Sequence, residues 1–141
     1  DIEIGEKFDT GKIATKTGQG LVYLHRHDYE ENKERAQRYT MGIDAMCIHT
    51  EFIDCLPQVM HCLGQTYWDI LFPYLFWKEG IKLFTVTEPY IYHKKHHIQY
   101  NSKDWEYWGK HTAQVVGRDN HRPAEISTWL YKLLETSTTI I

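Results

Sequence analysis

The sequence predicts an α/β (α+β) fold in which a small mixed β-sheet is packed by a buried central helix and two C-terminal helices. Residues 66–79 are apolar on nearly all sides at helical spacing, as expected of a helix deep inside a core. The strands are expected in three short β-prone runs, residues 20–26, 43–49 and 81–88. Residues 102–116 and 122–137 carry apolar positions on a polar background, which is typical of surface helices.

The chain has the size of one domain, and residues 1–141 are expected to form a single unit. A chain of this length buries roughly two thirds of the surface that its unfolded form exposes. No internal repeat, low-complexity stretch or linker rich in Pro, Gly or Ser divides it.

The amino-acid composition limits the kinds of binding partner that are expected. The net charge is −3 and 25% of the residues are charged, so no broad basic surface favours nucleic acid. Aromatic residues make up 14% of the chain, which fits either a surface that stacks on sugars or bases or an aromatic-rich core. No apolar stretch approaches the ~20 residues that cross a bilayer and no leader-like segment is seen, so no membrane span is expected.

The cysteines indicate a reducing compartment. Cys47, Cys55 and Cys62 are odd in number and form no C-x-x-C pair, so neither a disulfide framework nor a zinc knuckle is indicated. A cytoplasmic location follows as the expectation.

The N-terminal half is expected to alternate turns with its strands. Turn signals in "TGK" and "TGQG" predict a strand end and an irregular loop over residues 1–19. The charged residues 27–42 predict a short surface helix or an ordered loop. Residues 50–57 predict a short helix with Thr50 as its N-cap, and residues 58–64 a brief extended piece.

Gly and Pro set the boundaries of the C-terminal elements. Gly80 follows the central helix at the usual position for a helix end. Pro89 predicts that the chain leaves the sheet, so residues 89–101 are expected to form a loop, with Ser102 as the cap of the next helix. Three tryptophans at helical spacings are predicted to pack between the last two helices: Trp105, Trp108 and Trp129.

Asp69 is the residue that stands out, because it is the only charged side chain between Leu63 and Lys78. Pro73 cannot supply the amide that would bond the Asp69 carbonyl, so one interpretation starts the helix near Ile70 with Asp69 as its N-cap. The other interpretation places the carboxylate in a cleft as a general base, with a pKa raised by its apolar neighbours. The sequence leaves both open.

The histidines also have two interpretations. His93, His96 and His97 have the spacing of metal ligands on a helix, but after Pro89 a solvated, mildly basic loop is the simpler expectation. His25 and His27 alternate along a predicted strand, where without a third ligand they are expected to be ordinary surface residues.

The order of three segments carries a resemblance to a known family. The segments are "YTMGIDAMCIHTEFIDCLP", "GQTYWDILFPYLFWKEGIKLFTVTEP" and "YIYHKKHHIQY". Over roughly residues 20–100 this succession resembles the C-terminal half of GT-A-fold glycosyltransferases that use nucleotide-diphospho-sugars. In such enzymes a glycine-led strand carrying an acid precedes a Trp-Asp pair that opens a buried helix, and a later strand ends in Glu-Pro-x-x-Tyr-His. The opening "DIEIG" is similar to the tail of their acidic metal-binding turn.

The resemblance implies a role for each matching residue. Asp69 would deprotonate the acceptor hydroxyl as the catalytic base. Asp44 would line the acceptor pocket and Trp68 would stack on a sugar face. Asp1 would bind a divalent metal, and His93 would lie near the diphosphate or that metal.

The resemblance also implies cofactors and partners. The metal would be Mn²⁺ or Mg²⁺, with no organic cofactor, and the substrates would be a nucleotide-sugar and an acceptor glycan. A nucleotide-binding N-terminal half is missing, because the sequence has no glycine-rich turn of the Rossmann or P-loop kind. The chain is then either a fragment of a larger glycosyltransferase domain or a stand-alone relative that keeps the scaffold. It is expected to be inactive alone, with an exposed sheet edge through which a homo-oligomer could form.

Two other function classes remain open from the residues. One is a non-catalytic module that keeps the scaffold and binds a carbohydrate or a protein through its aromatic residues. The other is a metal-dependent hydrolase built on the histidines, which requires three of them within reach of one ion.

Overall fold

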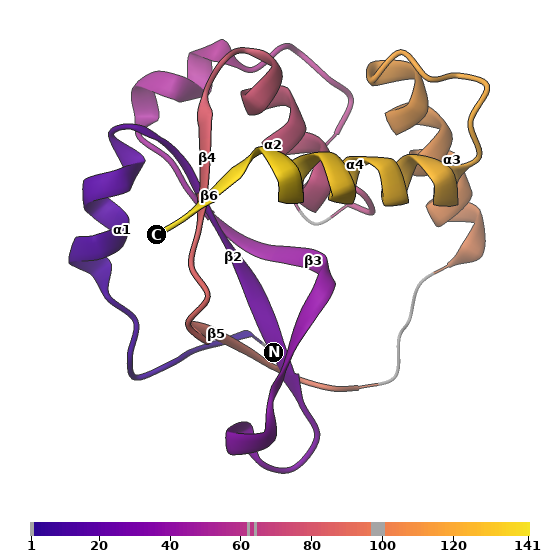
Figure 1. Cartoon of the computed structure of the whole chain (residues 1–141). Helices are drawn as coiled ribbons and strands as arrows, with labels where there is room; N and C mark the ends of the chain where they lie inside the picture. The colour runs from indigo at the N-terminus through magenta and orange to yellow at the C-terminus, as the bar shows by residue number, and fades with distance from the viewer. Residues whose placement is uncertain (1, 62, 64, 97–100) are drawn as a thin grey trace.

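The computed structural model describes residues 2–61, 63, 65–96 and 101–141, apart from the side chains of residues 40–42, and it confirms the α/β class. Figure 1 shows its elements, which are β1 (Ile2–Ile4), α1 (Thr10–Thr17), β2 (Gly20–Tyr29), the 3-10 helix η1 (Lys33–Arg35), β3 (Gln37–Cys47), the 3-10 helix η2 (Thr50–Cys55), α2 (Trp68–Lys78), β4 (Lys82–Thr85), β5 (Ile91–Lys94), α3 (Ser102–Val115), α4 (Pro123–Ser137) and β6 (Thr138–Ile140).

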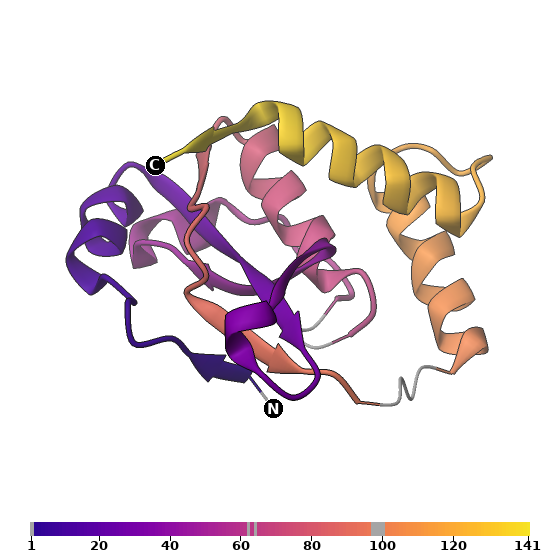
Figure 2. The same cartoon turned by 60° about the horizontal axis from the view of Figure 1, so that its bottom comes forward.

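Strand β2 is the centre of a mixed sheet to which the described residues contribute six strands. β3 pairs with it antiparallel from Val22 to Asp28, so β4 and β5, which both pair with β2 in parallel, lie along its opposite edge. β6 extends the sheet beyond β4 and β1 extends it beyond β5. The two terminal strands therefore lie on the same outer side of the sheet (Figures 1 and 2).

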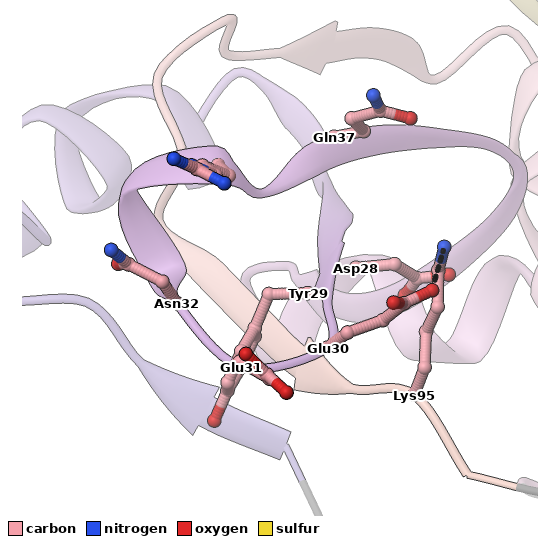
Figure 3. Close-up of a pocket in the computed structure, with 8 residues that line it drawn as sticks. Asp28, Tyr29, Glu30, Glu31, Asn32, Gln37 and Lys95 are labelled. Carbon is pink, nitrogen blue, oxygen red and sulfur yellow. Dashed lines mark ion pairs between the residues drawn. The ribbon is translucent and has the colours of Figure 1, made fainter.

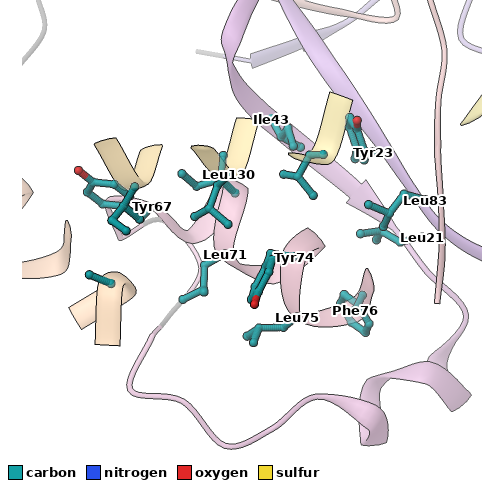
Figure 4. Close-up of a cluster of buried hydrophobic side chains, with 14 residues drawn as sticks. Leu21, Tyr23, Ile43, Tyr67, Leu71, Tyr74, Leu75, Phe76, Leu83 and Leu130 are labelled. Atoms are coloured by element: carbon teal, nitrogen blue, oxygen red, sulfur yellow. The ribbon is translucent and has the colours of Figure 1, made fainter. Parts of the chain in front are cut away.

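Alternate residues of β2 contribute to two hydrophobic cores, because successive side chains of a strand point to opposite faces. Leu21 and Tyr23 join the larger core, which α2 and α4 cover. Val22 and Leu24 join a smaller core with Ile13 of α1. Figure 4 shows the larger core, where side chains of α2 lie close to others from the strands and from α4.

The central helix predicted over residues 66–79 is α2. It is apolar nearly all round, and it ends before Gly80, whose φ of +82° is the left-handed conformation expected of a helix-ending glycine. Its buried residues are Ile70, Leu71, Pro73, Tyr74, Leu75 and Phe76. The burial of this helix on the sheet is the packing contact that fixes the position of Asp69.

Two predictions about the N-terminal half are wrong. Residues 1–19 were expected to be irregular after a strand end, but they contain α1, which starts where the Asp9 side chain accepts a hydrogen bond from the Lys12 amide over 2.9 Å. The charged residues 27–42 were expected to form a helix or loop, but they turn through η1 and continue as β3, because pairing with β2 satisfies their backbone groups.

Pro89 lies outside the strands, as predicted, but the prediction that residues 89–101 form a loop is wrong for β5. The chain bends between β4 and β5 and re-enters the sheet, where β5 is paired on one side by β2 and on the other by β1. This pairing brings His93 opposite both Asp28 and Ile2. A residue that was expected in a loop is therefore held on the sheet.

The remaining local predictions have mixed outcomes. η2 is capped by His49 rather than Thr50, and α3 by Asn101 rather than Ser102. Residues 58–61 form no strand, and Cys62 and Gly64 of the same predicted piece lie outside the described residues. His27 is only 9% exposed, so it is not a surface residue.

The two C-terminal helices, α3 and α4, are confirmed. Trp105, Trp108 and Trp129 are partly buried against the larger core. Trp105 contacts Tyr67 and Trp129 contacts Tyr74, so these two rings pack on α2 and the residue before it. Glu125 accepts a hydrogen bond from the Arg122 amide over 2.9 Å, which stabilises the start of α4. No helix among the described residues has the length and apolar character that crossing a bilayer requires.

Candidate functional site

Asp69 lies in the first turn of α2 and does not cap it. The residue before the helix is Tyr67, which has a left-handed backbone (φ +75°) and makes no side-chain cap hydrogen bond. The helix therefore begins at Trp68, and the prediction that it begins near Ile70 with Asp69 as its N-cap is wrong. A left-handed conformation is uncommon for a bulky residue and is often found near functional sites.

The Asp69 carboxylate points toward β3 and α4. Its Oδ2 accepts a hydrogen bond from the Tyr131 hydroxyl over 3.1 Å and a longer one from the Ile43 amide over 3.4 Å. These two contacts join α2 to α4 and to β3. They hold the carboxylate in one direction, as a positioned acid or base requires.

Burial changes the acidity of this pair. It raises the pKa of Asp69 to about 6, against the smaller lowering effects of the Tyr131 hydroxyl and the Ile43 amide, and the nearby Asp44 raises that pKa further. Burial and the Asp69 carboxylate together raise the pKa of Tyr131. At neutral pH Asp69 is thus ionised but close to its midpoint, the condition in which a carboxylate exchanges protons readily.

Asp44 lies where β3 departs from regular pairing with β2. Leu24 pairs with Ala45 and the next residue, His25, pairs with Ile43, so Asp44 is the extra residue of a β-bulge. Burial raises the pKa of Asp44, and the Arg26 guanidinium opposes that effect. Its Oδ2 is buried and has no hydrogen-bond partner among the described residues.

Arg26 links two acids. Its Nη1 lies 3.3 Å from Asp44 Oδ1, its Nε lies 2.9 Å from Asp28 Oδ1, and its guanidinium stacks 4.1 Å above the centre of the Tyr39 ring. The contact with Asp28 is an ion pair without good hydrogen-bond alignment. With its charge between two carboxylates, the pKa of Arg26 is raised despite burial.

His93 continues the chain of contacts on the far side of Asp28. Its Nδ1 lies 3.1 Å from Asp28 Oδ1, and its Nε2 lies 3.3 Å from Nε2 of His96. The carboxylate thus orients the His93 ring through one nitrogen while the other nitrogen faces a second imidazole. A carboxylate, an oriented histidine and a second nitrogen are the arrangement that metal sites use.

These side chains connect three of the predicted site residues. Asp69 and Asp44 interact electrostatically, and Arg26 and Asp28 bridge Asp44 to His93. His93 in turn lowers the pKa of Asp44. We call the set Asp69, Asp44, Arg26, Asp28, His93 and His96 the acidic relay.

The other two predicted residues are placed differently. Trp68 is partly buried at the first position of α2, and consecutive helical residues point about 100° apart, so it need not share the direction of Asp69. Asp1 lies outside the described residues. The residue after it, Ile2, is opposite His93 in the β1–β5 pairing.

A pocket of about 320 Å³ opens beside the Asp28 end of the acidic relay (Figure 3). An ion pair between Lys95 and Glu30, 3.6 Å long, lies on its wall. Its lining comes mostly from the β2–β3 hairpin: Asp28, Tyr29, Glu30, Glu31, Asn32, Arg35, Gln37 and Lys95. Neither Asp69 nor Asp44 lines it, so this hollow is not the cleft expected around those two acids.

Sequence reasoning missed three members of the site. Arg26 and Asp28 alternate along β2, and this i, i+2 pair of opposite charges on a predicted strand was the available signal. The partner Tyr131 comes from α4, 62 residues along the chain from Asp69. That contact depends on how α4 packs on α2, and no local pattern indicates it.

Among the described residues, no group of three or more His, Cys, Asp or Glu side chains is arranged to hold a metal ion. No family model, curated protein or solved structure matches the chain.

Proposed function

We propose that the chain is a glycosyltransferase-like domain that, together with a nucleotide-binding half, transfers a sugar from a nucleotide-diphospho-sugar to an acceptor hydroxyl. The acidic relay supports this most directly, because it connects Asp69 and Asp44 with His93. The resemblance in the order of the sequence segments assigned roles to the same three residues. The proposal needs a second half, since the 141 residues contain no glycine-rich phosphate-binding turn.

In this proposal Asp69 is the catalytic base. A base must be ionised at the working pH and must regain its proton easily, so a pKa of about 6 suits the role. The Tyr131 hydroxyl holds one carboxylate oxygen, which leaves the other to accept the proton of the acceptor hydroxyl. Asp44, whose Oδ2 has no partner in the described part of the chain, accepts a second hydrogen bond from the acceptor sugar, and Trp68 stacks on a sugar face.

His93 and His96 fit a divalent ion. Their facing ring nitrogens lie 3.3 Å apart, and they would hold the ion together with oxygen ligands, which Mn²⁺ and Mg²⁺ prefer. Asp28 would orient His93, and Asp1, the residue before Ile2 in the sequence, is proposed as the acidic ligand. When bound, Mn²⁺ or Mg²⁺ would neutralise charge on the diphosphate leaving group.

The proposed partners follow from this reaction. They are a nucleotide-sugar and an acceptor glycan, without nucleic acid. The outer edges of the sheet are proposed as the surface for a second copy of the chain, because strands there carry unpaired backbone groups. Free thiols at Cys47 and Cys55 support a reducing, cytoplasmic location.

A non-catalytic binding module is the second candidate. The observation that favours it is the hairpin pocket, which lies beside Asp28 but excludes Asp69 and Asp44. In such a module Glu30, Glu31 and Asn32 would bind sugar hydroxyls without any reaction.

Calorimetry with UDP- and GDP-sugars in the presence of Mn²⁺ tests the proposal, on this chain and on the longest open reading frame that contains it. We expect heat of binding from the longer protein, and its loss after His93→Asn. The matched control is His121→Asn, an exposed histidine on the α3–α4 connection. Binding of a free oligosaccharide without nucleotide, lost after Glu30→Gln, would instead support the binding module.

A further inference from the structure

Two histidine rings stack between the segment before α2 and the helix α3. The His61 and His111 rings are nearly parallel, 16° apart, with their centres 5.4 Å from each other. Trp108 packs edge-on against both, with its ring centre 4.7 Å from that of His61 and 5.7 Å from that of His111. His61 is only 7% exposed, so its ring lies among aromatic neighbours rather than in water.

One ring nitrogen of His61 is bonded and the other is not. Its Nε2 lies 2.9 Å from the Thr66 carbonyl oxygen. Because a carbonyl only accepts, Nε2 carries the proton of the neutral ring. Nδ1 is buried and has no hydrogen-bond partner among the described residues. A second proton on this ring would therefore lie on a buried nitrogen that has no acceptor in the described part of the chain.

The surroundings of His61 oppose a positive charge on its ring. Burial lowers the pKa of His61, the Thr66 carbonyl opposes that effect, and the neighbouring His111 lowers the pKa further. Among the described residues, the groups that act on the ring are thus the Thr66 carbonyl before α2 and His111 on α3, and neither is an acid. If both stacked rings were protonated, their charges would also repel each other.

The Thr66 carbonyl that His61 binds belongs to the peptide group joining Thr66 to Tyr67. Tyr67 has a left-handed backbone, and the centre of its ring lies 5.6 Å from that of Trp105 on α3. The next residue, Trp68, is the first of α2. The His61 ring therefore holds the peptide group that precedes an uncommon backbone conformation, and a conformation of this kind persists only where its surroundings hold it.

We propose that the stack of His61 on His111 is an acid-sensitive contact: a proton added at His61 Nδ1 moves the ring into water, breaks its bond to Thr66 and loosens the start of α2 from α3. The charged ring is stable where water solvates it, so the opening takes up one proton. The pKa of the buried ring lies below the ordinary 6.5, so the closed contact is favoured above that pH and loses stability as the pH falls below it. The proposal does not depend on the transferase proposal.

Two other groups titrate in the same range and must be separated from His61. Asp69 acts in the opposite direction, because its raised pKa makes the fold more stable as the pH falls from about 6 to about 4. His27 on β2 is also buried, with a pKa that burial lowers. A loss of stability in acid therefore indicates a histidine, and its position in the fold and the effect of substitution identify which one.

Hydrogen exchange at the start of α2 tests the proposal in the whole chain at pH 7, 6 and 5. The reporter is the Leu71 amide, which donates to the Tyr67 carbonyl oxygen over 2.9 Å. We expect its protection factor, relative to those in β4, to fall by up to about tenfold per pH unit below 6.5.

Substitutions of single histidines assign the effect. His61→Gln keeps a donor for the Thr66 carbonyl but does not ionise, so it should remove the pH dependence of Leu71 protection. The matched controls are His121→Gln, at an exposed position, and His27→Gln, at a buried one, and both should keep it. The same loss of protection in His61→Gln, or none in the unaltered chain, overturns the proposal.

A measurement on the unaltered protein covers the case in which the buried substitutions prevent folding. In a ¹⁵N NMR titration of the imidazole nitrogens, His61 Nδ1 should take up its proton with a midpoint below 6.5, in the same pH range in which the Leu71 amide loses protection. A His61 midpoint at or above 6.5, or protonation of His61 with Leu71 protection unchanged, overturns the proposal. Both outcomes leave the transferase proposal intact, because nucleotide-sugar binding tests that proposal separately.

Discussion

The Tyr131 hydroxyl donates a hydrogen bond to Asp69 Oδ2 over 3.1 Å and thereby connects α4 to the first turn of α2. The acid is held by a residue that lies far from it in the sequence and close to it only in the folded chain. Its direction and its acidity therefore depend on tertiary packing.

Replacing Tyr131 with Phe is expected to raise the pKa of Asp69 above 6, because the lost hydrogen bond favours the carboxylate form. Unfolding at pH 7 should become easier by about 1 kcal/mol. ¹³C NMR titration of the Asp69 carboxyl measures the first effect and urea unfolding the second. Tyr107→Phe, at an exposed position, should change neither. A lower or unchanged Asp69 midpoint in Tyr131→Phe would contradict the assigned contact.

The raised pKa of Asp69 predicts that the stability of the fold depends on pH. Its pKa is raised from 3.8 in the unfolded chain to about 6 in the fold, so the folded state binds more protons between these values. The free energy of unfolding should therefore fall as pH rises from about 4 to about 6, by about 3 kcal/mol for this group, and stay lower above pH 6.

Asp69→Asn should remove that slope, because the amide does not ionise. Urea unfolding at several pH values from 4 to 7 is the measurement. Asp119→Asn, at an exposed position, is the control and should keep the slope of the unaltered chain. If Asp69→Asn keeps the same slope, another group causes it.

The ion pairs of Arg26 should be strongly coupled. Arg26→Met leaves Asp28 and Asp44 without their shared cation, so each single change, Arg26→Met or Asp44→Asn, is expected to destabilise the fold. The double variant should lose less than the sum, with a coupling of roughly 1–3 kcal/mol in a urea double-mutant cycle. The exposed pair Arg122 and Glu125 is the matched control and should show much weaker coupling. Additive losses at Arg26 and Asp44 would contradict the acidic relay.

Gly109 allows α3 to approach its neighbours. An added Cβ would clash with Pro123 and lie 2.9 Å from the Tyr67 hydroxyl, so Gly109→Ala should cost about 1–3 kcal/mol in thermal or urea unfolding, despite the better helix propensity of Ala. Gly18→Ala has open space around it and an ordinary helical backbone, and should be neutral or slightly stabilising. Equal effects of the two substitutions would contradict this packing of α3.

The sequence predicts those elements whose apolar residues follow a clear spacing within a single segment. α2 is apolar on all sides, and α4 has a clear stripe, so their type and length follow from local spacing. α1 was missed because only Ile13 of its eight residues is buried, although Asp9 was a readable capping signal. β5 was missed because its pairing with β1 and β2 overrides the local effect of Pro89.

Sequence reasoning found those site residues whose type stands out from their neighbours in the sequence. Asp69, Asp44 and His93 were singled out, and the fold connects them through Arg26 and Asp28, which looked like ordinary strand charges. The capping role of Asp69 was wrong because a left-handed Tyr67 starts the helix two residues earlier. That backbone conformation depends on packing against α3 and cannot be inferred from the local sequence.

The rate of sugar transfer by Asp69→Asn, in the longest protein that contains this chain, tests the central claim most directly. With nucleotide-sugars and Mn²⁺ present, the unaltered protein should transfer sugar, and Asp69→Asn should be slower by roughly 10²–10⁴-fold while still binding the donor. Transfer by Asp69→Asn at the unaltered rate, or none by the unaltered protein with any donor, would contradict the assignment of Asp69 as the catalytic base.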